Sequence, residues 1–312
     1  MKPGFVDVTD PQTPPGLDRA TIAIGNFDGV HRGHQAVIAE VLRVAQADGA
    51  PAAALTFEPH PSDYFAGRPV VFRLTSAEEK VRQLRALGLD GVVTLTFNAA
   101  LAGLGAEAFV TEVLVRRLDI GAVVVGEDFQ FGKNRSGSTE YLQDAGLRHG
   151  FKVAVLRKLA PKDELVPLSS SAIRTALESG ALAGATAALG RPYAVEGVVQ
   201  MGQQLGRQLG VPTANVALAP TNRLAFGVYA VRVYVEGRRY GGVASFGVRP
   251  SVDNGAPLLE THIFTYRGDL YGVVIRVEFV AWLRGEAKFA TLDALKAEMQ
   301  RDIARAKALL AD

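Results

Sequence analysis

The sequence has no cysteine among its 312 residues, which excludes disulfide bonds, thiolate metal sites and cysteine nucleophiles. It also lacks an excess of charge. The formal net charge is +2, and no basic run is dense enough to favour nucleic acid as a partner. No stretch of about 18 apolar residues could span a bilayer, and residues 1–7 lack the apolar core of a signal peptide. We expect a cytoplasmic protein that binds neither membrane nor nucleic acid.

The residues that are present describe an ordinary globular protein. Hydrophobic side chains make up 48% and charged ones 21%, and the length is sufficient for two domains. Strands with little alternation, separated by amphipathic helices, favour a Rossmann-like α/β fold with a parallel sheet covered on both faces. The predicted strands are 21–25, 51–57, 91–97, 121–126 and 151–156, and the predicted helices are 33–48, 76–87, 105–118 and 138–149. The glycines expected to end these helices are Gly49, Gly88, Gly121 and Gly150.

The stretch from Gly25 to Gln35 connects the first predicted strand to the first predicted helix. It contains Asn26, and His31 and His34 fall where the helix begins. A helix N-terminus presents unpaired N–H groups and a partial positive charge, which suit a phosphate, and glycines let the backbone approach a ligand. A polar surface turn with two solvated histidines is the simpler alternative. The density of the pattern, in a chain with five histidines, favours a functional site.

Two further polar clusters follow predicted strands. Residues 58–63 come after the second strand, and residues 126–137 come after the strand at 121–126. Ligands bind beyond the carboxyl ends of parallel strands. We therefore expect these clusters to meet the turn that contains His31 at one edge of the sheet.

A serine-rich segment opens one more predicted helix, which runs to Gly180. It contains Ser169, Ser170 and Ser171, with Arg174 one turn further on. Serines at a helix start are usually caps, but three hydroxyls with an arginine also suit the outer phosphates of a nucleotide. The spacing alone favours neither interpretation.

Beyond about Gly190 the sequence changes to β-branched and aromatic runs, so we place a domain boundary there. Residues 235–238 supply a hairpin turn, and residues 292–310 have strong helical periodicity. The pattern predicts a small antiparallel β-barrel with a C-terminal helix. The predicted strands are 193–199, 229–235, 240–245, 259–264 and 273–282.

Two features of this second half carry chemistry. The first is a set of glycines spaced four residues apart, which suit either a loop folded over phosphates or the corners of a barrel. The side-chain oxygens of Thr213 and Asn215, which follow these glycines, could ligate Mg²⁺ or contact phosphate. Glu260 is a carboxylate in an otherwise apolar strand, where alternation also permits an outward-facing residue. The glycines are Gly202, Gly206 and Gly210.

The motifs of both halves together resemble one enzyme family over nearly the whole chain. The first half carries GNFDGVHRGH at 25–34, FEPHP at 57–61, VGEDFQFG at 125–132 and SSSAIR at 169–174. The second carries PTAN at 212–215, GVY at 227–229, GVRP at 247–250, DLYG at 269–272 and LRGE at 283–286. This order resembles bifunctional bacterial riboflavin kinase/FAD synthetases. The resemblance implies an FMN adenylyltransferase (nucleotidyltransferase) domain at 1–187, a riboflavin kinase domain at 188–312, the substrates riboflavin, FMN and ATP, and Mg²⁺ with ATP.

By this resemblance the first half transfers AMP from ATP to FMN, and His31 and His34 stabilise the charge on the ATP phosphates. Ser171 stands where many members have threonine, and it keeps the hydroxyl. The implied nucleotide contacts are Gly25, Asn26, Phe27, Gly33, Gly126, Ser170, Ser171 and Arg174. The implied flavin contacts are Pro59, Pro61, Phe65, Asp128 and Phe131.

By the same resemblance the second half phosphorylates riboflavin, with Glu260 as the general base for the ribityl hydroxyl. Thr213 and Asn215 hold Mg²⁺–ATP. Residues 203–205, Gln-Gln-Leu, stand where an acidic or basic residue is common, which could alter ATP affinity. The implied nucleotide contacts are Gly202, Gly206, Arg207 and Gly210.

Two other functions fit parts of the sequence. One is a nucleotidyltransferase for another substrate, with a barrel that only binds it. The other is a flavin sensor or a nucleic-acid-binding barrel without catalysis. The PTAN segment and Glu260 disfavour the first, and the near-neutral charge with complete motifs disfavours the second. The sequence indicates no oligomeric state.

Overall fold

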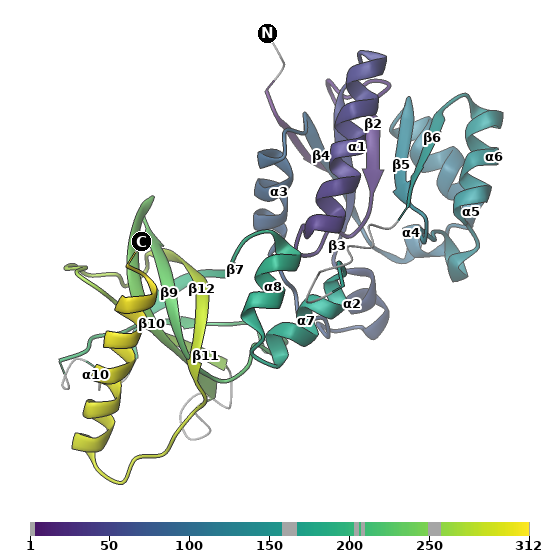
Figure 1. Cartoon of the computed structure of the whole chain (residues 1–312). Coiled ribbons are helices and arrows are strands. Elements are labelled where there is room, and N and C mark those ends of the chain that lie inside the picture. Colours follow the sequence, from purple (N-terminus) through teal and green to yellow (C-terminus); the bar gives the residue numbers. More distant parts are fainter. Residues whose placement is uncertain (1–3, 158–166, 203–205, 207–209, 249–256, 312) are drawn as a thin grey trace. The chain divides into compact units, whose positions relative to one another are not determined.

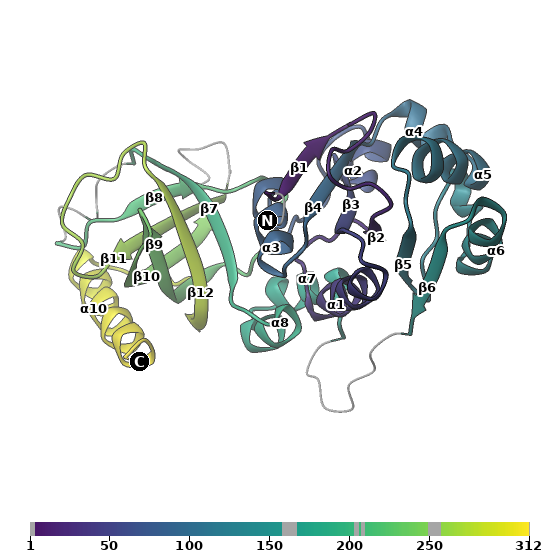
Figure 2. The same cartoon turned by 90° about the horizontal axis from the view of Figure 1, so that it is seen from above.

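The computed structural model describes residues 4–157, 167–202, 206, 210–248 and 257–311. Figures 1 and 2 show the chain from two directions at right angles. It divides into two compact units, Met1–Lys162 and Asp163–Asp312. Helices α7 (Ser170–Glu178) and α8 (Leu182–Leu189) pack on each other, and α8 packs on barrel strands of the second unit. The division of function at 187/188 stays a prediction.

The first unit is built on a six-stranded parallel sheet in the order β1-β4-β3-β2-β5-β6. The predicted parallel sheet is confirmed, and the five predicted strands agree with the structure within one residue at each end. The first strand was not predicted, because it has only four residues and pairs at the sheet edge. The strands are β1 (Val6–Thr9), β2 (Thr21–Ile24), β3 (Ala52–Glu58), β4 (Gly91–Thr96), β5 (Ala122–Gly126) and β6 (Lys152–Leu156).

Helices connect these strands, as the amphipathic segments predicted. Gly49 and Gly150 cap two of them in the left-handed conformation that glycine adopts without strain. Two short helices, α2 and α4, were not predicted. The helical elements are α1 (Arg32–Asp48), α2 (Pro61–Ala66), α3 (Ala77–Ala86), α4 (Ala99–Gly103), α5 (Ala106–Ala108), the π-helical η1 (Phe109–Arg117), the 3₁₀ turn η2 (Lys133–Arg135) and α6 (Thr139–His149).

Gly121 does not end a helix, contrary to the prediction. The helical segment before it ends at Arg117, and Gly121 stands at the start of β5. A Cβ at this position would lie 2.3 Å from the carbonyl oxygen of Arg19. The glycine is therefore explained by close backbone approach rather than by helix termination.

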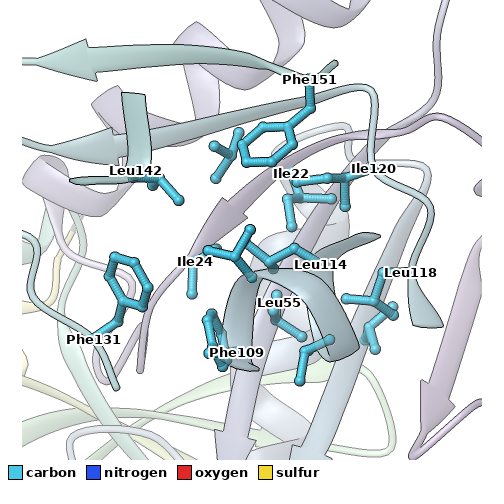
Figure 3. Packing of buried hydrophobic residues seen from close by; sticks show 14 of the residues in the cluster. Ile22, Ile24, Leu55, Phe109, Leu114, Leu118, Ile120, Phe131, Leu142 and Phe151 are labelled. Atoms are coloured by element: carbon cyan, nitrogen blue, oxygen red, sulfur yellow. The ribbon is translucent and has the colours of Figure 1, made fainter. Parts of the chain in front are cut away.

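Apolar side chains cover both faces of the sheet. One cluster joins Ile22, Leu55 and Val123 to η1 and α6 through residues such as Leu114 and Leu142, and Figure 3 shows part of it from close by. The other cluster packs α1 and α3 on the opposite face. Strand β2 is buried at all four positions, as expected for a strand covered on both faces, and three of its four residues are apolar.

The second unit is a closed barrel with the strand order β10-β11-β8-β7-β12-β9. The antiparallel barrel and the C-terminal helix α10 (Leu292–Leu309) confirm the prediction. The predicted hairpin turn is also present, with positive φ at Glu236 and Gly237, as a tight turn of this kind requires. The strands are β7 (Tyr193–Gln200), β8 (Ala214–Ala217), β9 (Gly227–Val235), β10 (Arg238–Val248), β11 (Pro257–Ile263) and β12 (Val274–Arg284).

Strand β8 was not predicted, because its four residues lie within the segment interpreted as a phosphate loop. Helix α10 packs across β9, β10 and β12. Its inner face includes Ile303 and Ala306, with Met299 and Leu310 partly buried beside them, as the helical periodicity predicted. None of the helices in the described ranges combines the length and the hydropathy needed to cross a bilayer.

Candidate functional site

The turn that contains His31 and His34 lies at the point where the strand order of the sheet reverses. Strands β3 and β4 follow β2 on one side, whereas β5 and β6 lie on its other side. In open parallel sheets, ligands bind beyond the carboxyl ends of the strands at this point. The loops after β2, β3 and β5 leave three neighbouring strands at the same edge. The predicted convergence of the three polar clusters is therefore confirmed.

The two histidines form a compact pair at the start of α1. His31 is the N-cap, and its Nδ1 accepts a hydrogen bond from the backbone N–H of His34 at 3.3 Å. The rings are stacked with centroids 3.6 Å apart. The Nδ1 atom of His34 is buried without a hydrogen-bond partner. Both imidazoles thus lie at the N-terminus of α1, the end at which a helix attracts a phosphate.

The pKa of His34 lies well below its usual value of 6.5. Loss of hydration around the ring is the largest cause, and the positive charges of His31 and Lys80 act in the same direction. The ring of His34 is therefore neutral at pH 7 in the absence of a ligand. An anion at the helix start would favour its protonated form.

The backbone before the histidines is strained. Phe27, Gly29 and Val30 have φ angles of +49°, +84° and +40°, and a positive φ is unfavourable for the β-branched Val30. The carboxylate of Asp28 holds the turn in place, since it accepts the backbone N–H of Leu74 at 2.9 Å and that of Thr75 at 3.1 Å. Asp28 is therefore a buried structural residue that anchors the turn to residues 74 and 75.

Four charged side chains lie under the turn and balance one another. Arg73 donates two hydrogen bonds to the carboxylate of Glu58, at 2.7 and 3.0 Å, and its Nε lies 3.8 Å from Asp28. Lys80, which is 1% exposed, donates to Glu58 at 2.7 Å. Burial raises the pKa of Glu58, but its contacts with Arg73 and Lys80 more than offset this and leave the pKa below its usual value.

The expected flavin contacts lie in two loops of this edge. Pro59 and Pro61 follow β3, and the ring of Phe65 in α2 is 70% exposed. Phe97, which the sequence analysis missed, has its ring 5.7 Å from that of Phe65 and 5.3 Å from that of Tyr64. Tyr64 and Phe97 are partly buried, and Phe65 is exposed beside them. A cluster of aromatic rings of this kind provides apolar faces for a planar ligand.

The loop after β5 holds the other two expected flavin contacts in different environments. Asp128 is exposed, whereas Phe131 is buried in the core cluster against Phe109, as Figure 3 shows. A Cβ on Gly137 would lie 2.5 Å from the Phe131 ring, so the ring fills its site closely. Phe131 thus has a core role, and its contact with flavin stays a prediction.

The serine-rich segment begins α7 in the second unit. Ser169 is its N-cap and accepts the backbone N–H of Ala172 at 3.2 Å, which bears out the capping interpretation for one of the three serines. Ser170, Ser171 and Arg174 lie in the first turns of the helix. Their contact with nucleotide phosphates stays a prediction.

A pocket of about 400 Å³ opens between the barrel and α10. This volume lies within the roughly 300–1,000 Å³ typical of small-molecule sites. Glu260 and His262 project into it from β11, because the alternate residues Leu259 and Thr261 are buried on the other face. Glu260 lies in the pocket, so it is not simply an outward-facing surface residue.

Three strands bring polar side chains together in this pocket. Glu260 is directly opposite Ser245 of β10 and Asn215 of β8. Asn215 is 6% exposed, and its Oδ1 has no hydrogen-bond partner. Thr213 lines the same pocket. The site therefore combines a carboxylate with a hydroxyl and an unpaired amide oxygen.

Two of the predicted loop glycines are required by close contacts. A Cβ on Gly202 would lie 2.0 Å from Asn215 Nδ2, and a Cβ on Gly206 would lie 2.4 Å from the carbonyl oxygen of Val211. Gly210 has a φ of +78°, which glycine accommodates. Arg207 and residues 203–205 lie outside the described residues.

The sequence analysis missed the wall of the pocket that α10 provides. Arg284 of β12 binds the carboxylate of Asp302 at 2.8 and 3.1 Å, and Asp302 is 6% exposed. Glu286 and Phe289 complete this side. The LRGE motif at 283–286 pointed to the neighbouring residues Arg284 and Glu286, and the periodicity of residues 292–310 predicted the helix but not its place in the pocket. In the part of the chain that the structure describes, no group of three or more His, Cys, Asp or Glu residues could hold a metal ion.

Comparison with known families assigns one activity to each segment. Residues 14–172 match the family described as FAD synthetase, and residues 189–310 match the family described as riboflavin kinase. The first segment contains the histidine pair, and the second contains the barrel pocket. The two sites therefore fall in two separate matched segments.

Individual proteins resemble the chain over nearly its full length. A bifunctional riboflavin kinase/FMN adenylyltransferase from Pseudomonas fluorescens is 41% identical over 289 residues, which cover 92% of each chain. One from Escherichia coli (strain K12) is 40% identical over 282 residues, which cover 90% of each. A crystal structure described as a macrolide-efflux protein from Streptococcus pneumoniae superposes with a TM-score of 0.85 at 27% identity, covering 97% of this chain and 99% of that one. The chain belongs to the family of bifunctional riboflavin kinase/FMN adenylyltransferases.

Proposed function

We propose that the chain makes FMN from riboflavin in the barrel pocket and FAD from FMN at the histidine pair, with one ATP consumed in each reaction. The observation that carries this proposal is the presence of two groups of polar residues, the histidine pair at the start of α1 and the pocket that contains Glu260, each within the segment that matches the corresponding family. His31 and His34 are the proposed catalytic residues of adenylyl transfer. Glu260 is the proposed general base of the kinase.

In adenylyl transfer, a phosphate oxygen of FMN attacks the α-phosphorus of ATP, and the bond to pyrophosphate breaks. The chain contributes positioning and charge stabilisation without a covalent intermediate. The N–H groups at the start of α1 and the imidazoles of His31 and His34 are the proposed donors to the phosphates. A neutral His34 can donate one hydrogen bond, and it gains a proton as negative charge gathers beside it.

In the kinase reaction, the ribityl hydroxyl of riboflavin loses its proton to Glu260 as its oxygen attacks the γ-phosphorus, and ADP leaves. A carboxylate within the pocket is the expected base for this transfer. The apolar residues of the pocket, such as Val228 and Leu295, suit the flavin ring. The Arg284–Asp302 pair holds α10 against this pocket.

Mg²⁺ is the proposed companion of ATP in the barrel. The residues fit it, because Asn215 Oδ1 is buried without a partner and Thr213 adds a hydroxyl, and Mg²⁺ prefers oxygen ligands. Thr213 and Asn215 would hold the ion together with the phosphates. When bound, Mg²⁺ neutralises part of the phosphate charge.

A two-stage assay tests the proposal. With riboflavin, ATP and Mg²⁺, chromatography should show FMN appearing before FAD. With FMN in place of riboflavin, FAD and pyrophosphate should form directly. Chelation with EDTA should stop FMN formation. Absence of both flavin products from the folded protein would overturn the proposed function.

A further inference from the structure

One backbone carbonyl in the turn from Gly25 to His34, here named the phosphate turn, is held by two buried side chains from outside the turn. The carbonyl oxygen of Asn26 accepts a hydrogen bond from Lys80 Nζ and another from Thr56 Oγ1, both at 3.3 Å. Thr56 lies on β3 and is 0% exposed, and Lys80 lies on α3 and is 1% exposed. Asn26 immediately precedes Phe27, the first residue of this turn with positive φ. The two donors therefore act where the strained backbone begins.

The ammonium group of Lys80 also reaches the end of β3. The segment that follows β3 carries the proposed flavin contacts Pro59, Pro61 and Phe65, and is named the flavin loop here. Lys80 Nζ donates to Glu58 Oε1 at 2.7 Å and to Thr56 Oγ1 at 3.0 Å. Glu58 is the last residue of β3, and Pro59 follows it directly. The three donors of one lysine thus join the carbonyl of Asn26 to the first residue before the flavin loop. An ammonium has three donors and no acceptor, so this lysine is fully used.

Charge balance explains why a second cation is present, because Glu58 and Asp28 are two carboxylates and Arg73 is a single cation. It does not explain why Lys80 Nζ also donates to Thr56 Oγ1 and to the carbonyl oxygen of Asn26, which carry no charge. A buried ion pair also costs free energy that apolar packing of the same volume would avoid. Strained turns persist only where the surroundings over-determine them, and they gather at functional sites. The position of Lys80 is therefore better explained by the alignment of Asn26 with Glu58 than by a gain in the stability of the fold.

We propose that Lys80 is a positioning residue for adenylyl transfer, which fixes the phosphate turn through Asn26 and the flavin loop through Glu58 relative to each other. This inference rests on the proposed FMN adenylyltransferase function of the first unit. The reacting groups come from two substrates, one held at each end of the network. A displacement of about 1 Å between them can lower the rate about 100-fold.

The double variant Lys80→Met/Glu58→Gln separates alignment from charge balance. Lys80→Met alone leaves Glu58 with one cation and can prevent folding. The double variant removes one charge of each sign, so Arg73 and Asp28 remain balanced. Kinase activity in the second unit and calorimetric unfolding report whether the chain is folded. Lys152→Met is the matched control, because it removes a lysine that pairs with Asp48 on the surface of the same unit.

Steady-state kinetics of FAD formation from FMN give the decisive readout. For the double variant we expect kcat to fall by about 10-fold or more and the KM for FMN to rise about fivefold or more, with kinase activity unchanged. A merely structural role would lower kcat through an inactive fraction and leave the KM for FMN as it is. That result, or wild-type kinetics, would overturn the inference. Lys152→Met should match the wild type.

Thr56→Val decides the matter if the double variant does not fold. It is nearly isosteric and changes no charge. It removes the Thr56 donor to the Asn26 carbonyl and also the acceptor of one Lys80 hydrogen bond, so it weakens the network at both points. We expect kcat of FAD formation to fall several-fold with the kinase unaffected, and an unchanged kcat would overturn the inference. If wild-type protein makes no FAD from FMN, the proposed function itself fails, which is distinct from either variant result.

Discussion

The rings of His31 and His34 are stacked at 3.6 Å between centroids, and the backbone N–H of His34 is bound to the Nδ1 of His31. Two imidazoles this close cannot both carry a proton without strong repulsion. His34 is therefore neutral when no ligand is bound, and it can take up a proton when phosphates arrive. This property sets the behaviour expected of His34 in catalysis and in titration.

Replacement of His34 by Ala should separate the two reactions. The variant loses a proposed phosphate contact at the start of α1, so FAD formation from FMN should fall by about 100-fold or more. FMN formation from riboflavin should be unchanged, because it takes place in the barrel. His149→Ala is the control, because His149 lies at the end of α6, where its Nε2 is 3.3 Å from Oε1 of the exposed Glu107. Equal loss of both activities in folded His34→Ala would contradict two independent sites.

The titration of His34 should be displaced towards low pH. Its folded pKa lies well below 6.5, so the unfolded chain binds more protons below that pH, and this group makes the fold more stable as pH rises towards 6.5. NMR of the imidazole nitrogens should show His34 neutral at pH 6, with its signal assigned by His34→Gln. Addition of ATP should raise the pKa. A signal that titrates near 6.5 without ATP would contradict the prediction.

Much of the first site could be predicted from the order of strands and polar segments along the sequence. Parallel strands end at one edge, so residues directly after β2, β3 and β5 had to meet there. Lys80 and Arg73 could not be found in this way. A lysine on an amphipathic helix resembles an ordinary solvated residue, and only the packing of α3 shows that Lys80 is buried.

The barrel shows the same limit from the other direction. Glu260 was recognisable because a carboxylate in an apolar strand is unusual. Asp302 was not, because a carboxylate on a C-terminal helix is common, and its pairing with Arg284 depends on how α10 packs. Phe131 shows the converse, since its motif pointed to flavin while its ring is part of the core.

Replacement of Glu260 by Gln should give the mirror image of the His34 variant. The amide keeps the size of the side chain but cannot accept the proton of the ribityl hydroxyl, so FMN formation should fall by about 100- to 10,000-fold. FAD formation from added FMN should persist. Glu278→Gln is the control, because Glu278 of β12 contacts Tyr234 of β9 and Arg276 of its own strand. Normal FMN formation by Glu260→Gln would remove Glu260 from the role of base.

Gly202→Ala should impair the kinase through Asn215. The new methyl group would lie 2.0 Å from Asn215 Nδ2, so the amide must move away from its position. If Asn215 holds Mg²⁺–ATP, the KM for ATP in FMN formation should rise while FAD formation from FMN stays normal. Gly103→Ala, where a Cβ meets open space, is the control. An unchanged KM for ATP would argue against this role of Asn215.

Asp302→Asn should loosen α10 from the barrel. The change leaves Arg284 with its guanidinium only 23% exposed and with Glu298 at 3.6 Å as its remaining carboxylate. An exposed ion pair contributes about 0–1 kcal/mol to the free energy of unfolding, and loss of one partner of a buried pair lowers it by about 3–5 kcal/mol. Because this pair is partly buried, we expect Asp302→Asn to lower the free energy of unfolding by about 2 kcal/mol. Urea unfolding followed by the fluorescence of Trp282, the single tryptophan, measures this change.

Arg301→Ala is the control for Asp302→Asn, because Arg301 belongs to a more exposed pair on the same helix, and it should change the free energy of unfolding by less than about 0.5 kcal/mol. Equal effects of the two variants would mean that the Arg284–Asp302 pair does not hold the helix, and that other contacts of α10, such as the apolar packing of Ile303 and Ala306, hold the pocket wall in place.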